Sequence, residues 1–334
     1  MATMADHKTL ADYLASVADL PKDLRTGLLS VADACREIAT LVDRAPINGQ
    51  LGALQQSNVQ GEEQKALDVA SNDVFLDLCG ARSEFAALGS EEMDDHWARA
   101  GHEAGPYLLV FDPLDGSSNI EVSMAVGSIF SILPRDPARI GSGVEEAEFL
   151  QTGSNQVAAG YALYGSQTLL VFSCGAGVVG FTLDRARGEW LLTHPELKVP
   201  AKSSEYAINA AHRRHWSPGV RAFVEACEAG AEGPIGKDRN MRWTGAMVAE
   251  IHRILVRGGL FIYPSDKRPG HGSGKLRLLY ECSPAGWLMA QAGGAAIGDD
   301  GPVLDITPHK LHQRTAIALG SAEEVARFES FLRG

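Results

Sequence analysis

The stretch LLVFDPLDGSSN, residues 108–119, ends an apolar run on two aspartates, Asp112 and Asp115. Asp, Pro and Gly favour turns for local reasons, so a plain β-turn is one interpretation of DPLDG. The spacing is not that of an EF-hand loop, which needs a further aspartate before its glycine. Paired carboxylates at the end of a buried strand are instead suited to holding a hard metal ion.

Further carboxylates stand in motifs elsewhere in the chain: Asp68 in KALDVASND, Glu91 and Glu92 in SEE, and Glu281 in KLRLLYE. Taken singly, each of Asp68, Glu91 and Glu92 could instead be an ordinary solvated charge on the surface, because acidic residues are mostly exposed. Glu281 is harder to explain in that way, since it lies between apolar neighbours. A cluster of oxygen ligands from several elements is what Mg²⁺ prefers, shared with a substrate phosphate.

Gly116, Ser117 and Ser118 follow Asp115 directly. They supply backbone N–H groups and hydroxyls suited to phosphate oxygens, so metal ions and amides would face the same anion. The stretch RPGHGSGK, residues 268–275, lacks the GxxxxGK[ST] pattern of a nucleotide-binding loop because Leu276 follows the lysine. It is interpreted as a loop leading to Lys275. The ten histidines show no zinc-binding spacing.

Composition excludes several classes of function. The 334-residue chain has a formal net charge of −12, which argues against nucleic-acid binding and requires an anionic substrate to be met locally by metal ions or a few basic residues. No apolar stretch of about 18 residues is present, so no membrane span is expected. The start MATMADHKTLADYL is too polar for a signal peptide. Five scattered cysteines without CxxC spacing indicate reduced, mostly buried thiols, and the predicted location is cytoplasmic.

Hydrophobic periodicity predicts alternating helices and strands, hence layered sheets and helices. A Pro- and Ser-containing stretch at 193–205 suggests a boundary that divides the chain into residues 1–195 and residues 196–334. Ser321 and Glu324 are predicted to form a capping box at the start of the last helix. The expected helices cover 26–45, 65–81, 245–259, 283–294 and 321–332. The expected strands lie within 108–112, 124–133, 156–165, 167–176, 178–184 and 259–264, with a segment at 275–284 ending in a turn.

The block FDPLDGSSNIEVSMAVGSIF resembles the signature of class I fructose-1,6-bisphosphatases. The resemblance extends through ALDVASND, SEE, GAMVAEIHRILVRGGLFIYP, KLRLLYECSPAGWLMAQAGG and LHQR, from about Asn58 onward. It implies an α/β fold of five layers, α-β-α-β-α, with two mixed sheets, in which residues 1–195 form a metal-binding phosphatase domain and residues 196–334 an α/β sugar-phosphate-binding domain. It also implies a homotetramer that binds a small sugar bisphosphate and uses two or three Mg²⁺ per subunit, with Mn²⁺ as a substitute.

The same resemblance assigns roles to residues of this chain. Asp68 and Glu92 would orient and deprotonate the attacking water, and the arginine at the position of Arg242 would reach into a neighbouring subunit. The implied metal ligands are Glu91, Asp112, the carbonyl of Leu114, Asp115, Glu281 and Glu62. The implied substrate contacts are Asp115, Gly116, Ser117 and Ser118 at the 1-phosphate, Asn209, Arg242, Trp243 and Tyr263 at the 6-phosphate, and Lys275 at the sugar.

The predicted reaction is therefore hydrolysis of D-fructose 1,6-bisphosphate to fructose 6-phosphate and phosphate, in gluconeogenesis, the Calvin cycle or both. Sedoheptulose-1,7-bisphosphatase activity, alone or as a second activity, is the nearest alternative, because only the sugar end of the site separates the two. Inositol-monophosphatase-like activity and a non-catalytic phosphosugar sensor are weaker alternatives. The chain departs from the animal enzymes in lacking their AMP loop at 20–30, and it lacks the cysteine-bearing insertion of the chloroplast type. Regulation by AMP or thioredoxin is therefore not expected.

Overall fold

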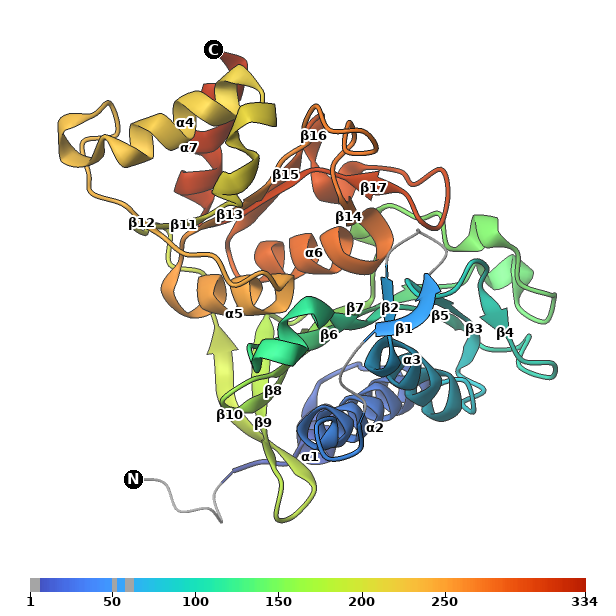
Figure 1. Cartoon of the computed structure of the whole chain (residues 1–334). Helices are drawn as coiled ribbons and strands as arrows, with labels where there is room; N and C mark the ends of the chain where they lie inside the picture. Colours follow the sequence, from blue (N-terminus) through green and yellow to red (C-terminus); the bar gives the residue numbers. More distant parts are fainter. Residues whose placement is uncertain (1–6, 50–52, 58–62) are drawn as a thin grey trace.

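Five layers build the molecule, as the resemblance predicts (Figure 1). The computed structural model describes residues 7–49, 53–57 and 63–334. Helices α1 to α3 form one outer layer, followed by an eight-stranded sheet, a central layer of α5 and α6, a six-stranded sheet, and an outer layer of α4 and α7. Each sheet is thereby covered by helices on both faces, which buries its apolar strands.

The helices have the following bounds: α1 Leu10–Ser16, α2 Lys22–Arg44, α3 Ala66–Leu78, α4 Pro218–Glu228, α5 Met247–Arg257, α6 Ser283–Gln291 and α7 Ala322–Arg333. The strands have the following bounds: β1 Ala53–Ser57, β2 Glu63–Lys65, β3 Phe85–Ser90, β4 Trp97–Ala98, β5 Tyr107–Asp115, β6 Val126–Pro134, β7 Ala158–Tyr164, β8 Thr168–Ser173, β9 Val178–Asp184, β10 Glu189–Leu197, β11 Glu205–Ala207, β12 Asn240–Met241, β13 Leu260–Tyr263, β14 Leu276–Arg277, β15 Ala295–Gly298, β16 Gly301–Pro302, β17 Arg314–Thr315 and β18 Ile317–Gly320.

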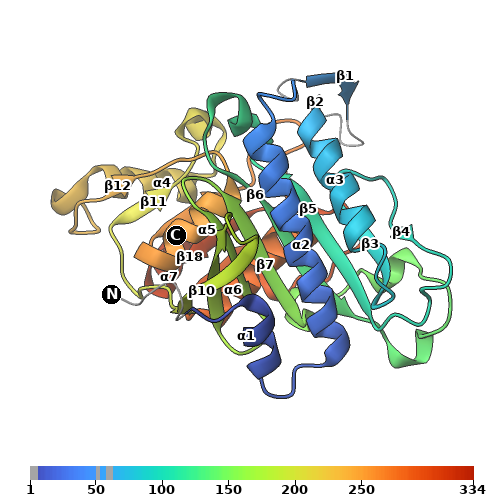
Figure 2. The same ribbon diagram turned by 90° about the horizontal axis from the view of Figure 1, so that it is seen from below.

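The eight-stranded sheet has the order β10-β9-β8-β7-β6-β5-β3-β4 and is mixed, since β3 pairs in parallel with β5 and the other pairs are antiparallel. Helices α2 and α3 lie across one face of it (Figure 2). Phe75 of α3 stacks on Phe111 of β5, with ring centroids 4.3 Å apart. This contact fixes α3 against the strand that ends in Asp112 and Asp115, so the outer layer supports the acidic strand end.

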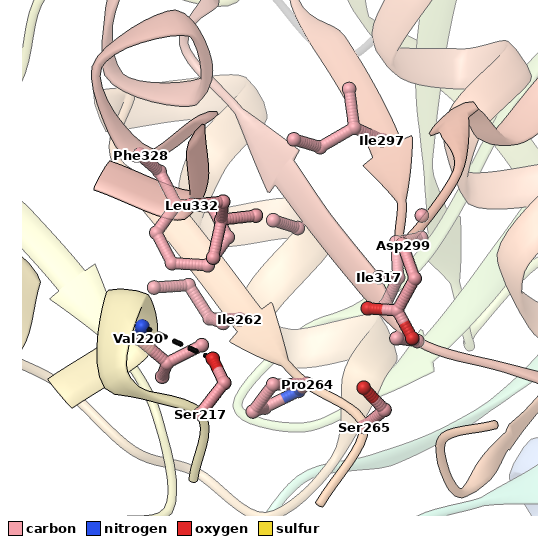
Figure 3. A pocket seen from close by; sticks show the side chains of 13 residues that line it. Ser217, Val220, Ile262, Pro264, Ser265, Ile297, Asp299, Ile317, Phe328 and Leu332 are labelled. Atoms are coloured by element: carbon pink, nitrogen blue, oxygen red, sulfur yellow. Dashed lines mark hydrogen bonds between the residues drawn. The ribbon is translucent and has the colours of Figure 1, made fainter. Parts of the chain in front are cut away.

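The six-stranded sheet has the order β12-β11-β13-β18-β15-β16. Strand β11 pairs in parallel with both β12 and β13, so this sheet is mixed as well. Between this sheet and the helices α4 and α7 lies a small cavity of about 40 Å³, lined mainly by apolar side chains such as Ile262, Ile317 and Phe328 (Figure 3). A space of that size holds at most a few water molecules and offers no room for a metabolite.

Most of the expected elements are confirmed, and two details are wrong. All five expected helices exist, and the helix at 245–259 ends, as predicted, at a glycine with positive φ, Gly258 at 71°. The capping box at the last helix does not form: the Ser321 hydroxyl donates to the carbonyl of Pro200 at 2.5 Å and accepts from the N–H of Gly259 at 3.0 Å. Glu324 instead forms a buried ion pair with Arg239 at 2.7 Å. Tertiary partners therefore replace the local cap.

The segment 275–284 also differs from the expected turn. After the short strand β14, residues Leu278–Cys282 form one turn of π-helix that runs directly into α6. This turn brings Glu281 back beside Arg277, whose N–H donates to the Glu281 carboxylate at 2.6 Å. Four of the five free cysteines are buried and Cys174 is half-buried, as predicted. Within the described part of the chain, no helix is long and apolar enough to cross a membrane.

Candidate active site

A cavity of about 590 Å³ opens where the acidic end of the first sheet meets the second sheet. Most of the residues that the sequence singled out line it. They are Glu91, Asp112, Leu114, Asp115, Gly116, Ser117, Ser118, Asn209, Trp243, Tyr263, Lys275 and Glu281. Residues more than 100 positions apart in the chain are therefore brought to one cavity, which is large enough for a small phosphorylated sugar.

The end of β5 holds its two aspartates in different ways. The Asp112 carboxylate accepts the N–H of Leu114 at 2.9 Å, within its own turn. The Asp115 carboxylate accepts the N–H of Val248 at 2.8 Å, from the first turn of α5. The positive end of a helix favours a negative charge at that position. The DPLDG segment is thus more than a local turn, because its second aspartate is held by a helix 133 residues further along the chain.

Gly116 is required at the turn that follows. Its φ is 76°, and a Cβ at this position would lie 2.4 Å from the Cβ of Ala246. Any larger residue would both strain the backbone and push α5 away from Asp115. The close approach keeps the Gly116–Ser118 backbone and the start of α5 together on one wall of the cavity.

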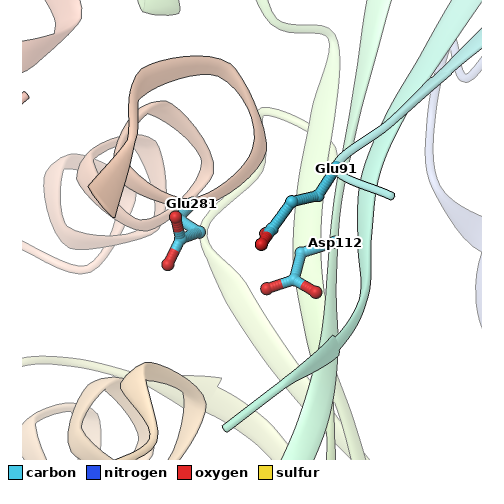
Figure 4. Close-up of side chains that lie close together, drawn as sticks. All are labelled: Glu91, Asp112 and Glu281. Carbon is cyan, nitrogen blue, oxygen red and sulfur yellow. The ribbon is translucent and has the colours of Figure 1, made fainter. Parts of the chain in front are cut away.

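Three carboxylates converge at the floor of the cavity. Oxygen atoms of Glu91, Asp112 and Glu281 all lie within 4.8 Å of one another (Figure 4). All three residues are buried, with 7%, 6% and 3% of their surface exposed. The alternative interpretation of Glu91 as a solvated surface charge is therefore wrong. The N–H of Glu91 donates to the carbonyl of Phe111 at 3.1 Å, which continues the pairing of β3 with β5 and keeps Glu91 beside Asp112.

Burial and mutual repulsion raise the pKa values of Asp112, Asp115 and Glu281. Desolvation, followed by the charges of Glu91, Asp115 and Glu281, places the pKa of Asp112 well above its usual range. Desolvation also raises the pKa values of Asp115 and Glu281 to about 7, although backbone N–H donors act in the opposite direction. A bound cation would relieve this repulsion, and a set of close carboxylate oxygens is the donor set that a hard divalent ion takes. The residues present therefore fit a divalent metal ion.

Arg277 is a member of this cluster that the sequence interpretation missed. Its guanidinium lies 2.6 Å from the Glu91 carboxylate, and both side chains are buried. With the bond from its N–H to Glu281, Arg277 fixes two of the three carboxylates. The signal was present in KLRLLYE, where a charged residue four positions before Glu281 stands in the same apolar run.

The opposite side of the cavity is aromatic. The indole of Trp243 stacks on Phe261, with ring centroids 6.1 Å apart and planes 16° from parallel. The Tyr263 ring lies 6.1 Å from that indole, at a tilt of 47°. Asn209 precedes a short 3₁₀ helix and accepts the N–H of Ala211 at 3.2 Å through its side chain. The rings of Trp243 and Tyr263 form a wall suited to the apolar face of a sugar, and the polar Asn209 lines the same cavity.

Three predicted residues of the described part of the chain are not among those that line this cavity. Asp68 is buried in the first turn of α3, and Glu92 is half-buried in the turn after β3. The half-exposed side chain of Arg242 forms an ion pair with Glu205 at 3.5 Å. Glu62 lies outside the described residues.

The layered fold, the buried carboxylate cluster and the amide-rich turn beside it define the class of protein as a phosphoric monoester hydrolase. Residues 8–195 match the family model described as fructose-1-6-bisphosphatase, N-terminal domain, and residues 199–333 match the model of the C-terminal domain. The chain belongs to the fructose-1,6-bisphosphatase family.

Solved structures agree with this assignment. The holo form of the Leishmania major fructose-1,6-bisphosphatase is 35% identical, with a TM-score of 0.92, and the match covers 98% of this chain and 99% of the other. The T-state form of the same enzyme is 34% identical, with a TM-score of 0.86, covering 97% and 98%. Its apo form gives 34% identity and a TM-score of 0.86, covering 98% and 100%.

Proposed function

We propose that this protein removes the 1-phosphate of D-fructose 1,6-bisphosphate with the help of bound Mg²⁺, yielding fructose 6-phosphate. The observation that carries the proposal is the cluster of Glu91, Asp112 and Glu281 within the same cavity as the Gly116–Ser118 turn. Carboxylates alone would repel a phosphate, whereas carboxylates with bound cations attract it. Family membership supports the substrate.

The metal ligands in this proposal are Glu91, Asp112, the carbonyl of Leu114, Asp115 and Glu281, for two or three ions, with Glu62 as a further ligand. When bound, Mg²⁺ or a substituting Mn²⁺ would lower the pKa of a water molecule and offset charge on the phosphoryl oxygens. Arg277 keeps Glu91 in place through its ion pair.

The chain's own groups hold the reacting phosphate. The N–H groups of Gly116, Ser117 and Ser118 and the two hydroxyls donate to its oxygens, in the manner of an anion-binding turn. Asp68 and Glu92 orient the attacking water and accept its proton. Displacement at phosphorus then needs no covalent nucleophile from the protein.

At the other end, Asn209, Trp243 and Tyr263 hold the 6-phosphate and Lys275 contacts the sugar. Arg242 contributes to the site of a neighbouring subunit in a homotetramer, which accounts for its absence from the wall of the cavity in its own chain. We divide the chain into a phosphatase domain, 1–195, and a sugar-phosphate domain, 196–334. The proposed setting is cytoplasmic, in gluconeogenesis or the Calvin cycle.

Sedoheptulose 1,7-bisphosphate is the second candidate substrate. The cavity of about 590 Å³ has room for a sugar with one further carbon. Both substrates would place the same kind of phosphate at the acidic end of the cavity.

The test is phosphate release from fructose 1,6-bisphosphate, sedoheptulose 1,7-bisphosphate and inositol 1-phosphate, each with Mg²⁺ and with EDTA. We expect Mg²⁺-dependent phosphate release from fructose 1,6-bisphosphate. The ratio of this rate to the rate with sedoheptulose 1,7-bisphosphate reports whether the enzyme acts on one substrate or on both. Release from inositol 1-phosphate alone, or no release from any of the three by folded protein, would overturn the proposal.

A further inference from the structure

A recess of about 10 Å³ adjoins the sugar end of the catalytic cavity, and the two spaces share Asn209 and Tyr263 as lining residues. The recess is also lined by His212, Asp266 and Arg268, which take no part in the proposed function. A space of this size holds at most one water molecule, so no metabolite binds inside it. Its side chains can therefore act on a substrate only through their neighbours.

Arg268 is held in place by Asp266, which is buried. Nε of the guanidinium lies 3.0 and 2.9 Å from the two oxygens of the Asp266 carboxylate, and Nη2 donates to one of these oxygens at 2.6 Å. The same carboxylate accepts the backbone N–H of Arg268 at 2.9 Å. A two-point pairing of this kind fixes the orientation of the planar guanidinium as well as its position.

Arg268 also contacts two histidine rings. Nη1 lies 3.1 Å from Nε2 of His212, and Nη2 lies 3.4 Å from Nδ1 of His271. A guanidinium can only donate, so both ring nitrogens accept, and each ring is neutral with its proton on the other nitrogen. Because all three nitrogens of Arg268 have protein partners, we infer that Arg268 acts through these neighbours and does not bind the substrate itself.

The charges around His212 oppose its protonation. Desolvation, followed by the charge of Arg268, lowers the pKa of His212, and His215 and His271 act in the same direction. Asp266 acts in the opposite direction, but its carboxylate is already paired with Arg268. The ring of His212 therefore stays an acceptor at neutral pH.

His271 is kept neutral in the same way. Desolvation, followed by the charge of Arg268, lowers the pKa of His271, and Lys275 and Arg314 add to this effect while Asp266 opposes it. One guanidinium thus holds two uncharged rings, and each ring belongs to a different segment of the chain.

The first ring connects Arg268 to the segment that begins at Asn209. The N–H of His212 donates to the carbonyl of Asn209 at 3.1 Å, at the start of the short 3₁₀ helix Ala210–His215. The side chain of Asn209 accepts the N–H of Ala211 at 3.2 Å in the same turn. A displacement of His212 would therefore move the turn that orients Asn209.

The second ring connects Arg268 to the loop that ends at Lys275. The N–H of His271 donates to the carbonyl of Arg268 at 3.0 Å. The carbonyl of His271 accepts the N–H of Asp266 at 3.1 Å and the N–H of Gly274 at 2.9 Å. Lys275 follows this hydrogen-bonded loop directly, so the loop sets where its side chain begins.

We propose that Arg268 is a positioning residue for the sugar end of the catalytic cavity, which holds the Asn209 segment and the Lys275 loop at a fixed separation. This proposal rests on the proposed function, in which Asn209 and Lys275 contact the substrate. The bond from Arg268 to His212 exists only while that ring is uncharged. The affinity for a sugar phosphate therefore decreases as the pH falls through the range in which His212 takes up a proton.

The test measures the dissociation constant of fructose 6-phosphate by titration calorimetry on the whole protein, in EDTA at pH 8. We expect binding by Arg268→Met to be about tenfold weaker than by the wild type, because hydrogen bonds to a charged group are lost. In the Mg²⁺ assay the same variant should raise KM for fructose 1,6-bisphosphate with kcat nearly unchanged, since the carboxylate cluster lies at the other end of the cavity.

Arg268→Lys separates geometry from charge. An ammonium group keeps the charge but cannot pair with Asp266 in a fixed fork and reach His212 as well, so this variant should bind about as weakly as Arg268→Met. Full binding by Arg268→Lys would show that charge alone matters and would overturn the proposal. Thermal melting reports whether each variant is folded, and Arg268→Lys carries the comparison if Arg268→Met does not fold.

Arg214→Met is the matched control, because this exposed arginine lies in the same 3₁₀ helix and lines neither space. Its dissociation constant should equal that of the wild type. Equal weakening in Arg214→Met and Arg268→Met, or no saturable binding by the wild type, would overturn the proposal. Loss of phosphate release would instead overturn the proposed function, whereas equal fructose 6-phosphate binding by wild type and Arg268→Met overturns this proposal alone.

The double variant His212→Gln/His271→Asn tests the role of the protons. Its side-chain oxygens can accept from Arg268 but cannot be protonated. Between pH 8 and pH 6 the wild type should lose more affinity than this variant, although both lose some because a phosphate monoester takes up a proton with a pKa of about 6. Equal losses in the two proteins would overturn the requirement for uncharged rings.

Discussion

The two ends of the catalytic cavity are built in opposite ways. At the acidic end, Glu91, Asp112 and Glu281 are buried, close together and held by backbone N–H groups or by Arg277. At the sugar end, Trp243 and Tyr263 are half-buried and contact each other mainly through ring faces and edges. The first end has little freedom to move, whereas the second can adjust by rotation about side-chain bonds.

This difference indicates how chemistry and specificity are divided. Charged groups that act on a reacting phosphate must be pre-oriented in a site of low dielectric constant, where each misplaced charge is costly. Groups that recognise a sugar contribute smaller, more replaceable contacts. Substitutions at the acidic end should therefore change rate or stability strongly, and those at the sugar end should change mainly KM.

The largest effect is expected for Asp115→Ala. Phosphate release from fructose 1,6-bisphosphate should fall by about 10³-fold or more, because a ligand and an orienting carboxylate disappear together. The protein should remain folded. The folded-state pKa of Asp115 is raised to about 7, so its ionised form destabilises the metal-free protein above that pH, and its removal should not lower the melting temperature at pH 8. Steady-state kinetics and thermal melting in EDTA check both statements.

Glu189→Ala serves as the control for that variant, because this carboxylate is exposed on β10, outside the cavity. Its rate should be unchanged. Near-normal turnover by Asp115→Ala would remove Asp115 from the catalytic centre.

Arg277→Gln should cost about 3 kcal/mol of unfolding free energy, the lower end of the range for breaking a buried ion pair. The reason is that Glu91 would lose this ion pair while Asp112 and Glu281 remain beside it. Urea unfolding in EDTA measures the loss. Arg36→Gln is the matched control: its pair with Asp33 at 2.8 Å is about 40% exposed on each side and should contribute less than about 1 kcal/mol. Equal losses in the two variants would contradict the account.

Trp243→Ala should raise KM for fructose 1,6-bisphosphate by about threefold to tenfold, with kcat nearly unchanged. An aromatic contact of this kind contributes roughly 0.5–1.5 kcal/mol, and the substitution removes the indole ring that contacts both the substrate and Phe261. Trp243→Tyr keeps an aromatic ring with a polar group at its end, so its KM should be close to that of the wild type. A large loss of kcat in Trp243→Ala would show that the two ends are not separable.

Tyr263→Phe should have the smallest effect, about threefold on KM. One neutral hydroxyl contributes about 0.5–1.5 kcal/mol, and the ring would keep its place beside Trp243. Comparing KM for fructose and sedoheptulose bisphosphates in this variant sharpens the comparison, because only the sugar end distinguishes them. An unchanged KM for both substrates would place the hydroxyl outside the contact.

Local patterns in the sequence were sufficient to predict several elements and to single out the carboxylates Glu91, Asp112 and Glu281, which the structure brings together. The apolar run before Asp112 is strand β5, and the periodic segment before Gly258 is helix α5. In both cases the spacing of apolar residues and the residues that end the element predict the same structure.

Strand β11 and helix α4 were not predicted. Strand β11 has only three residues and is held by its pairing with β13, which no local pattern reveals. Helix α4 is as long as α5 and has a local start signal in Ser217, which caps it, and Pro218, which begins it; this signal was missed.

The contacts that complete the site could not be predicted from local patterns. The bond from Val248 to Asp115 joins positions far apart in sequence, and the ion pair of Arg277 with Glu91 joins two motifs that were interpreted separately. Ser321 shows the opposite failure. A good local capping signal was overridden by Pro200 and Gly259, which tertiary packing places within reach of the hydroxyl.

The central claim is that the buried carboxylates bind divalent cations, and titration calorimetry of the substrate-free protein with Mg²⁺ tests it most directly. We predict saturable binding by the wild type and binding at least about tenfold weaker in Glu281→Gln, which keeps the shape of the side chain but removes its charge. Equal Mg²⁺ binding by both folded proteins, or none by the wild type, would contradict the account.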